Sequence, residues 1–117
     1  MKRLLLLVRT PPYGSAAIPE STRTCLGLAT MSFDISYVLM DDAAWAVLPD
    51  QRADLIEGNN ALALITGLTD LGVKLCVEAE ALAERGLSTE LLGSEFAAIS
   101  RAEIADLIAQ ADVVLTY

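Results

Sequence analysis

The sequence contains no histidine, so it lacks the side chain that most often acts as a general base and most often binds transition metals. It is also poor in basic residues, with 8 lysines and arginines against 16 aspartates and glutamates and a formal net charge of −8. Nucleic acids and anionic membrane surfaces attract clustered positive charge, so both are disfavoured as direct partners. We expect no metal and no other cofactor.

Long apolar runs are missing as well, because no stretch approaches the ~20 residues of a membrane span. Lys2 and Arg3 precede an apolar run at residues 4–8, as in a signal peptide, but the run is short and Arg9 interrupts it. We therefore expect a first strand there and a cytoplasmic protein. The two cysteines, Cys25 and Cys76, are not expected to form a disulfide in that compartment.

What the chain has in abundance is apolar side chains. Its 117 residues suffice for one domain with one core, and we expect residues 1–117 to form a single domain. The hydrophobic fraction of 54% is high for a soluble domain. This predicts that another subunit covers part of the apolar surface.

Hydrophobic periodicity predicts alternating strands and helices along the whole chain. The expected strands span residues 2–8, 35–40, 73–78, 96–99 and 113–117, and the expected helices span 18–31, 43–48, 61–71, 79–85 and the stretch after Ser100. Residues 50–60 are expected to form a loop with one turn of helix. This order predicts a three-layer α/β/α fold with a mainly parallel, five-stranded sheet and helices on both faces.

Smaller features of the same pattern predict helix ends and buried faces. Asp41 and Asp42 are expected to cap the helix at 43–48, and Ser100 with Glu103 forms a capping box for the last helix. The predicted buried faces are Ala79, Leu82 and Ala83 in one helix and Ile104, Leu107 and Ile108 in the last. Glu80 and Glu84 form an i, i+4 pair that is expected to face solvent.

Residues 73–87 hold the most informative junction. Alternation places Lys74, Cys76 and Glu78 on one face of a strand, and a helical period begins at Ala79. Glu78 therefore stands where a strand ends and a helix begins, which is where parallel α/β proteins build their sites. The simpler interpretation is that Glu78 only caps the helix.

Other candidate site residues also follow predicted strands. Tyr13 and Gly14 lie in a loop that could bind an anion through backbone N–H groups, although it matches neither G-x-G-x-x-G nor G-x-x-x-x-G-K-[ST]. A plain connection between a strand and a helix is the simpler explanation. Asp41, with Asp42, could hold Mg²⁺ or simply cap a helix. Trp45 is expected to border the same surface or to serve packing alone.

The cysteines allow one further chemistry. Cys76 could act as a nucleophile if its thiolate were stabilised, or it could be an inert core residue. Cys25 lies in the middle of a predicted helix and is expected to be buried.

Four stretches together resemble a known family. They are K-R-L-L-L-L-V-R-T-P-P-Y-G at 2–14, D-D-A-A-W-A-V-L-P-D-Q at 41–51, V-K-L-C-V-E-A-E-A-L-A-E-R-G-L at 73–87 and A-D-V-V-L-T-Y at 111–117. In their order and spacing they resemble the DsrE/DsrF group of sulfur-relay proteins, and most of all its DsrF/TusC branch. The resemblance covers essentially the whole chain.

The resemblance implies a three-layer α/β/α subunit of a homo- or hetero-oligomer, with DsrE/TusD-like and DsrH/TusB-like subunits as partners. It also implies a sulfur carrier of the DsrC/TusE or TusA kind as a further partner. In such relays a cysteine persulfide passes from protein to protein and serves tRNA 2-thiouridine formation or dissimilatory sulfur oxidation.

The resemblance also implies where sulfur would be carried. In the family the persulfide cysteine ends the third strand, seven residues before the arginine of an R-G-L-like turn; here that arginine is Arg85 and the matching residue is Glu78. A carboxylate cannot carry sulfane sulfur, and its charge would raise the pKa of Cys76. We therefore predict a subunit that does not carry sulfur.

Two alternatives remain: a sulfurtransferase that uses Cys76, or less favourably Cys25, and a small-ligand or anion-binding module with Glu78, Tyr13 and Trp45 at its pocket. A Cys76 thiol open at the rim of a cleft would count against the preferred interpretation.

Overall fold

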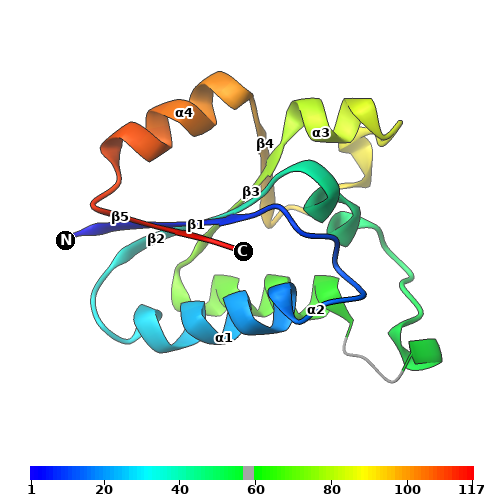
Figure 1. Ribbon diagram of the computed structural model, residues 1–117, viewed down its shortest axis with the longest axis horizontal. Coiled ribbons are helices and arrows are strands. Elements are labelled where there is room, and N and C mark those ends of the chain that lie inside the picture. The colour runs from blue at the N-terminus through cyan, green and yellow to red at the C-terminus, as the bar shows by residue number, and fades with distance from the viewer. Residues whose placement is uncertain (57–59) are drawn as a thin grey trace.

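A computed structural model describes residues 1–56 and 60–117 (Figure 1). The elements, in chain order, are β1 (Arg3–Val8), α1 (Ala17–Ala29), β2 (Asp34–Leu39), η1 (Asp41–Val47), η2 (Ala53–Ile56), α2 (Ala61–Thr66), η3 (Gly67–Leu71), β3 (Lys74–Glu78), α3 (Ala79–Glu84), η4 (Thr89–Leu91), β4 (Phe96–Ile99), α4 (Arg101–Gln110) and β5 (Val113–Thr116), where η marks a 3₁₀-helix. None of the helices in these ranges is both long and apolar enough to cross a membrane.

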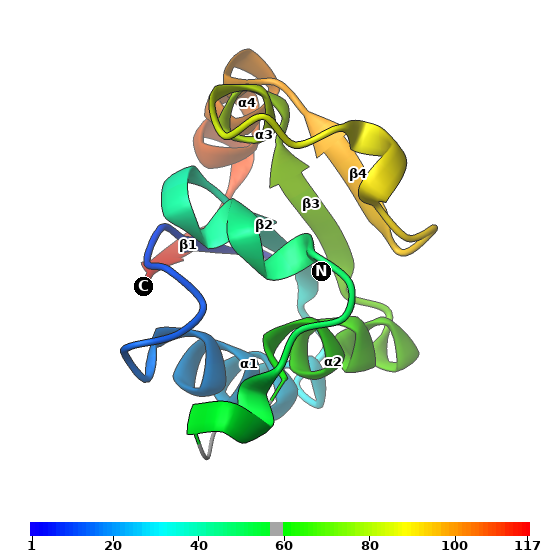
Figure 2. The same cartoon turned by 90° about the vertical axis from the view of Figure 1, so that its right-hand side faces the viewer.

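The five strands form one parallel sheet in the order β4-β3-β2-β1-β5. Helices α1 and α2 cover one face, and α3 and α4 cover the other, so the sheet is the middle of three layers (Figures 1 and 2). This confirms the predicted fold. Because all strands run the same way, their carboxyl ends meet at one edge of the sheet.

The hydrophobic core is larger on the α1/α2 face than on the α3/α4 face. Leu6, Tyr37 and Ile65 belong to the main cluster, whereas the second cluster has four buried members among the described residues: Leu5, Leu7, Val38 and Ile104. Residues 4–8 of β1 are buried without alternation because the strand is covered on both faces.

The segment after β2 differs from the prediction. It is a 3₁₀-helix that starts at Asp41, and Met40 stands at its N-cap with no side-chain capping bond. Capping by Asp41 and Asp42 was therefore a wrong prediction, because both carboxylates turn to arginines instead. The predicted helix at 61–71 is an α-helix that tightens into a 3₁₀-helix, and Gly72 ends it with φ +79°.

Two predicted buried faces are also partly wrong. In α3 the buried residues are Ala81 and Leu82, while Ala83 is exposed. In α4 Ile104 is buried but Ile108 is 42% exposed, because the helix covers only part of its sheet face. Of the predicted loop at 50–60, residues 53–56 form a turn of helix, and residues 57–59 lie outside the described residues.

The capping box of the last helix is confirmed. The hydroxyl of Ser100 accepts a hydrogen bond from the backbone N–H of Glu103 at 3.1 Å. Because Ser100 directly follows β4, this cap starts α4 at the carboxyl edge of the sheet. The first helical residue, Arg101, is thereby placed beside the end of the neighbouring strand β3.

Candidate functional site

The centre of the candidate site is the end of β3. The pleat of this strand turns Lys74, Cys76 and Glu78 toward the α3/α4 face, as the alternation predicts. Glu78 is the last of the three, and it is 1% exposed although its side chain is ionisable. A carboxylate buried this deeply needs a charged or hydrogen-bonding partner.

Glu78 has such partners on two sides. The Nε of Arg101 donates to one carboxylate oxygen at 2.6 Å, and the backbone N–H of Asp41 donates to the other at 3.2 Å. The hydrogen bond that Arg101 donates to Glu78 is also the main reason why the pKa of Arg101 lies above its ordinary value. Glu78 is the N-cap residue of α3, but its side chain makes no capping bond, so the simpler interpretation of this residue was wrong.

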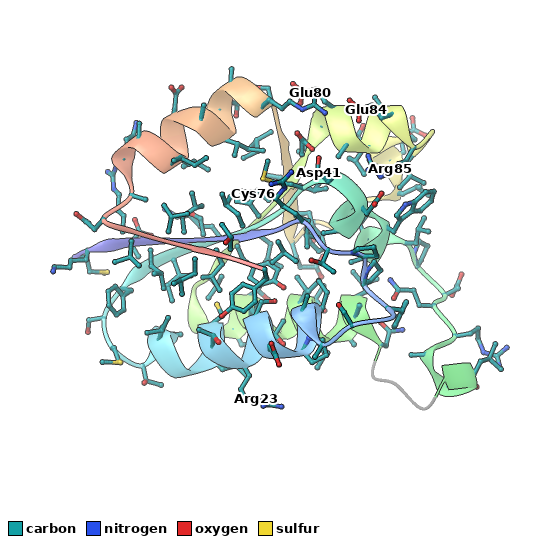
Figure 3. All side chains as sticks on the ribbon, in the orientation of Figure 1. Arg23, Asp41, Cys76, Glu80, Glu84 and Arg85 are labelled. Carbon is teal, nitrogen blue, oxygen red and sulfur yellow. The ribbon has the colours of Figure 1, made fainter. Side chains whose placement is uncertain are left out.

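Arg101 connects α3 and α4. Its guanidinium also donates to Glu84 at 2.7 Å, and its backbone N–H donates to both carboxylate oxygens of Glu80 at 3.1 and 3.0 Å. That backbone hydrogen bond lowers the pKa of Glu80. Figure 3 shows Glu80 and Glu84 on α3 near the start of α4. Glu84 is exposed, as predicted, and Glu80 is partly buried; both also bind Arg101, which the prediction did not include.

Two further ion pairs border the site. Asp41, which adopts a left-handed backbone with φ +50°, accepts a hydrogen bond from Arg9 at 2.8 Å. Asp42 accepts from Arg85 at 2.8 Å, and Arg85 also donates to the carbonyl of Ala81. The hydrogen bond that Arg9 donates to Asp41 raises the pKa of Arg9. The carboxyl end of the sheet is thus a set of paired charges, not an open acidic surface.

These pairs bear on the two carboxylates suggested for Mg²⁺. A cation would have to displace Arg9 from Asp41 and Arg85 from Asp42. Within residues 1–56 and 60–117, no three acidic or cysteine side chains gather as a set of metal ligands. A hollow of about 420 Å³ opens beside the pairs and is lined by Arg9, both aspartates and the C-terminal Tyr117.

Three predicted pocket residues lie apart from Glu78 or have other roles. The hydroxyl of Tyr13 accepts from the backbone N–H of Ala61 at 3.2 Å and bonds the side chain of Gln51, and its ring packs on the α1/α2 core. Gly14 supplies the φ of +93° that its loop requires. Trp45 lies in η1 and is 38% exposed.

Cys76 shares the face of Glu78 but not its surroundings. It is half-buried and lines a groove of about 420 Å³ that opens toward the amino ends of the strands. Burial raises the pKa of its thiol; the charge of Lys74 opposes this rise and that of Glu103 adds to it. The acid that acts on Cys76 is therefore Glu103, not Glu78 as predicted. Because the thiol lines a groove, the alternative that uses Cys76 stays open.

Cys25 is the less accessible of the two thiols. It is 0% exposed within α1, and burial raises its pKa to about 11. A thiol so placed is protonated at neutral pH and closed to reagents.

Arg101 is the residue of the candidate site that sequence reasoning missed. Arg85, the arginine of the family motif, does not bind Glu78; its guanidinium pairs with Asp42 and Glu84. A usable signal was present: the capping box fixes Arg101 as the first residue of a helix that follows β4, and β4 pairs with β3. Adjacent parallel strands bring such ends together.

Comparisons with known proteins agree with this fold. The model of the DsrE/DsrF-like family matches residues 2–117. TusC of Escherichia coli K12 and TusC of Shigella sonnei are each 29% identical over 91 residues, which cover 77% of this chain and 76% of the relative. The crystal structure of YchN from E. coli covers both chains fully, with a TM-score of 0.89 and 28% identity. A protein of unknown function from Methanobacterium thermoautotrophicum, MTH1491, has a TM-score of 0.76 at 12% identity and supports the fold alone.

Proposed function

Because this chain belongs to the DsrE/DsrF-like family, we propose that it is a subunit of a cytoplasmic sulfur relay and does not itself carry sulfur. In the relay it holds DsrE/TusD-like and DsrH/TusB-like subunits together, and the assembled complex binds a sulfur carrier of the DsrC/TusE or TusA kind. The pathway served is tRNA 2-thiolation or sulfur oxidation.

One observation supports the proposal that this subunit does not carry sulfur. The position that resemblance assigns to the persulfide cysteine holds Glu78, buried and bound to Arg101 at 2.6 Å. Sulfur transfer needs a thiolate that attacks a donor persulfide, takes its outer sulfur and releases the donor as a thiolate. A carboxylate has no sulfur with which to form that bond. The ion pair with Arg101 also keeps this carboxylate from turning outward toward a partner.

A gain-of-function test addresses this position directly. The protein is treated with a low-molecular-weight persulfide donor, and mass spectrometry of proteolytic peptides locates any added sulfur atom. In a Cys76→Ser background, we expect no adduct while residue 78 is glutamate and an adduct on residue 78 after Glu78→Cys. Glu78→Ala in the same background is the matched control, since it removes the carboxylate without adding a thiol.

Assembly is tested separately. Native mass spectrometry of the chain mixed with DsrE/TusD-like and DsrH/TusB-like subunits is expected to show one stoichiometric complex. The same complex should form with the Cys76→Ser variant, because the proposed role needs no thiol. A chain that stays monomeric in the mixture would contradict the proposal.

A second candidate is a sulfurtransferase that uses Cys76. The observation that favours it is the half-buried thiol in the groove on the α4 face. Under this alternative the natural protein takes up one sulfur atom, Cys76→Ser abolishes it, and the loaded protein passes the sulfur on to a carrier. Retention of the adduct after Cys76→Ser would reject it. The third candidate, a small-ligand module at the strand ends, predicts hits in a thermal-shift screen of small anions.

A further inference from the structure

The groove lined by Cys76 is a separate feature from the strand-end site. It measures about 420 Å³ and is bordered by the first residues of three strands, Arg3, Asp34 and Lys74, at the amino edge of the sheet. Glu78 and Arg101 do not line it. Its volume falls in the range of small-molecule pockets, about 300–1,000 Å³, and is too small for a docked helix.

The lining of the groove is apolar inside and charged outside. Leu5, Ile99 and Leu107 form the apolar part, and Cys76 lies among them. This arrangement suits a small organic molecule whose uncharged body rests inside and whose charged group reaches the rim.

The rim holds two positive charges, and one of them is paired. Lys74 pairs with Asp34 at 3.3 Å, and a guanidinium nitrogen of Arg3 donates to the neutral amide of Gln110 at 2.8 Å. The carboxylates of the lining, Asp34, Glu103 and Asp106, outnumber these two cations by one, so the groove as a whole carries negative charge.

The two carboxylates on the α4 wall of the groove have few partners. Glu103 and Asp106 lie three positions apart, so they project from the same side of the helix. Among the described residues, Asp106 accepts no hydrogen bond and no ion pair, and the carboxylate of Glu103 meets only Ser100, at 3.4 Å. Glu103 also lies close enough to Cys76 to influence its thiol.

We propose that this groove binds small organic cations, with an ammonium group between Glu103 and Asp106 and an apolar body against Leu5, Ile99 and Leu107. The proposal concerns a different site from the proposed sulfur-relay function and does not rest on it. The Cys76 thiol lies beside the bound molecule and reports its presence.

Thiol–disulfide exchange with small disulfides of different charge tests the proposal. The probes are cystamine with two ammonium groups, bis(2-hydroxyethyl) disulfide with none, and 3,3′-dithiodipropionate with two carboxylates. In each case the Cys76 thiolate attacks one sulfur, the S–S bond of the probe breaks, a mixed disulfide forms and the other half leaves as a thiolate. Rates are measured by mass spectrometry and divided by the rate of the same probe with the denatured protein.

The normalised rate of exchange with Cys76 is expected to be highest for cystamine, lower for the neutral probe and lowest for the dianion. At low salt the rate for cystamine should exceed that for the neutral probe about fivefold. The double variant Glu103→Gln with Asp106→Asn should remove this difference in rate between cystamine and the neutral probe. Glutamine at position 103 keeps the capping box, so α4 is expected to stay intact. The matched control is the double variant Glu20→Gln with Asp70→Asn, which removes the same number of negative charges from exposed positions on the α1/α2 side. The difference in rate between cystamine and the neutral probe should persist in this control.

Three results would overturn the proposal. Equal normalised rates for the three probes would mean that the groove does not select charge. If the preference for cystamine survives in the variant Glu103→Gln with Asp106→Asn, it comes from the overall charge of −8 and not from these two residues. No modification of Cys76 in the folded protein would mean that the groove does not admit molecules of this size. Cys25, at 0% exposure, serves as the internal blank in every sample.

Discussion

Glu78 and Cys76 lie two residues apart on the same face of β3, yet their surroundings are opposite. Glu78 is buried and bound to Arg101 and to the backbone of Asp41, so the end of the strand is closed by charge pairing. Cys76 is half-buried in a groove that Arg101 does not line. The comparison shows that a strand position alone does not define a site; the element that packs over each residue does.

The largest expected effect concerns access to the thiols. Alkylation by iodoacetamide should modify Cys76 at a measurable rate and Cys25 about a thousandfold more slowly, because Cys25 reacts only when the structure opens. Peptide mapping at successive times gives both rates. The Cys76 rate should rise with pH through a pKa above that of an ordinary thiol, since burial raises it.

In denaturant, Cys25 and Cys76 should be alkylated at equal rates. This control shows that the difference in the folded protein does not come from the residues next to each cysteine in the sequence. If folded Cys25 reacts as fast as Cys76, the core around α1 is not as closed as described. If Cys76 is as protected as Cys25, the contrast between the groove and the strand end disappears.

The next effect is on stability. Arg101→Ala leaves the buried Glu78 carboxylate without its charged partner, which should lower the free energy of unfolding measured with urea well beyond the change in the matched control. The matched control is Arg52→Ala, which removes an ion pair between exposed side chains and should change stability little.

The double variant Arg101→Ala with Glu78→Gln should be more stable than Arg101→Ala alone, because no buried charge is left unpaired. A double variant that is less stable than Arg101→Ala would show that the loss comes from packing and not from the carboxylate.

A smaller effect is expected at the border of the site. Arg85 and Asp42 pair at 2.8 Å with side chains 17% and 56% exposed, so a double-mutant cycle with Arg85→Met and Asp42→Asn should give a coupling of about 0.5 kcal/mol. A coupling as large as that between Glu78 and Arg101 would mean that the border and the centre act as one network.

The smallest effect is the pH dependence from Glu80. Its pKa is lowered in the folded state, so its contribution to stability is fully present at neutral pH and is lost as pH falls through that lowered value. The melting temperatures of the natural protein and Glu80→Gln should therefore differ most near neutral pH and converge in acid, below the ordinary carboxyl pKa of about 4. Glu90→Gln is the matched control, because it also removes one negative charge from the same part of the chain. A gap that is constant with pH would contradict the role of the Arg101 N–H bond.

Local residue patterns allowed much of the fold to be predicted. The apolar run of β1, the alternation of β3 and the Ser100–Glu103 capping box each depend on neighbours within a few positions, and each is observed. The errors arose where distant segments meet. Whether Asp41 caps a helix or binds Arg9 depends on the pairing of β1 with β2, which residues near Asp41 do not encode.

The candidate site was predictable in position but not in its contacts. The strand–helix junction at Glu78 follows from a change of period at one point of the chain. Its partner Arg101 lies 23 positions away and is brought there by the pairing of β3 with β4. The groove beside Cys76 likewise needs α4 to pack on a particular part of the sheet.

The sequence by itself determined the order of elements, the parallel α/β class and the presence of a carboxylate at the end of β3, because side-chain periodicity and backbone preference act over short distances. Only the tertiary structure decided that this carboxylate is buried beneath Arg101 and that Cys76 lines a groove. The physical reason is that burial and charge pairing depend on which distant elements pack together, and the energies of such contacts are set by the assembled layers.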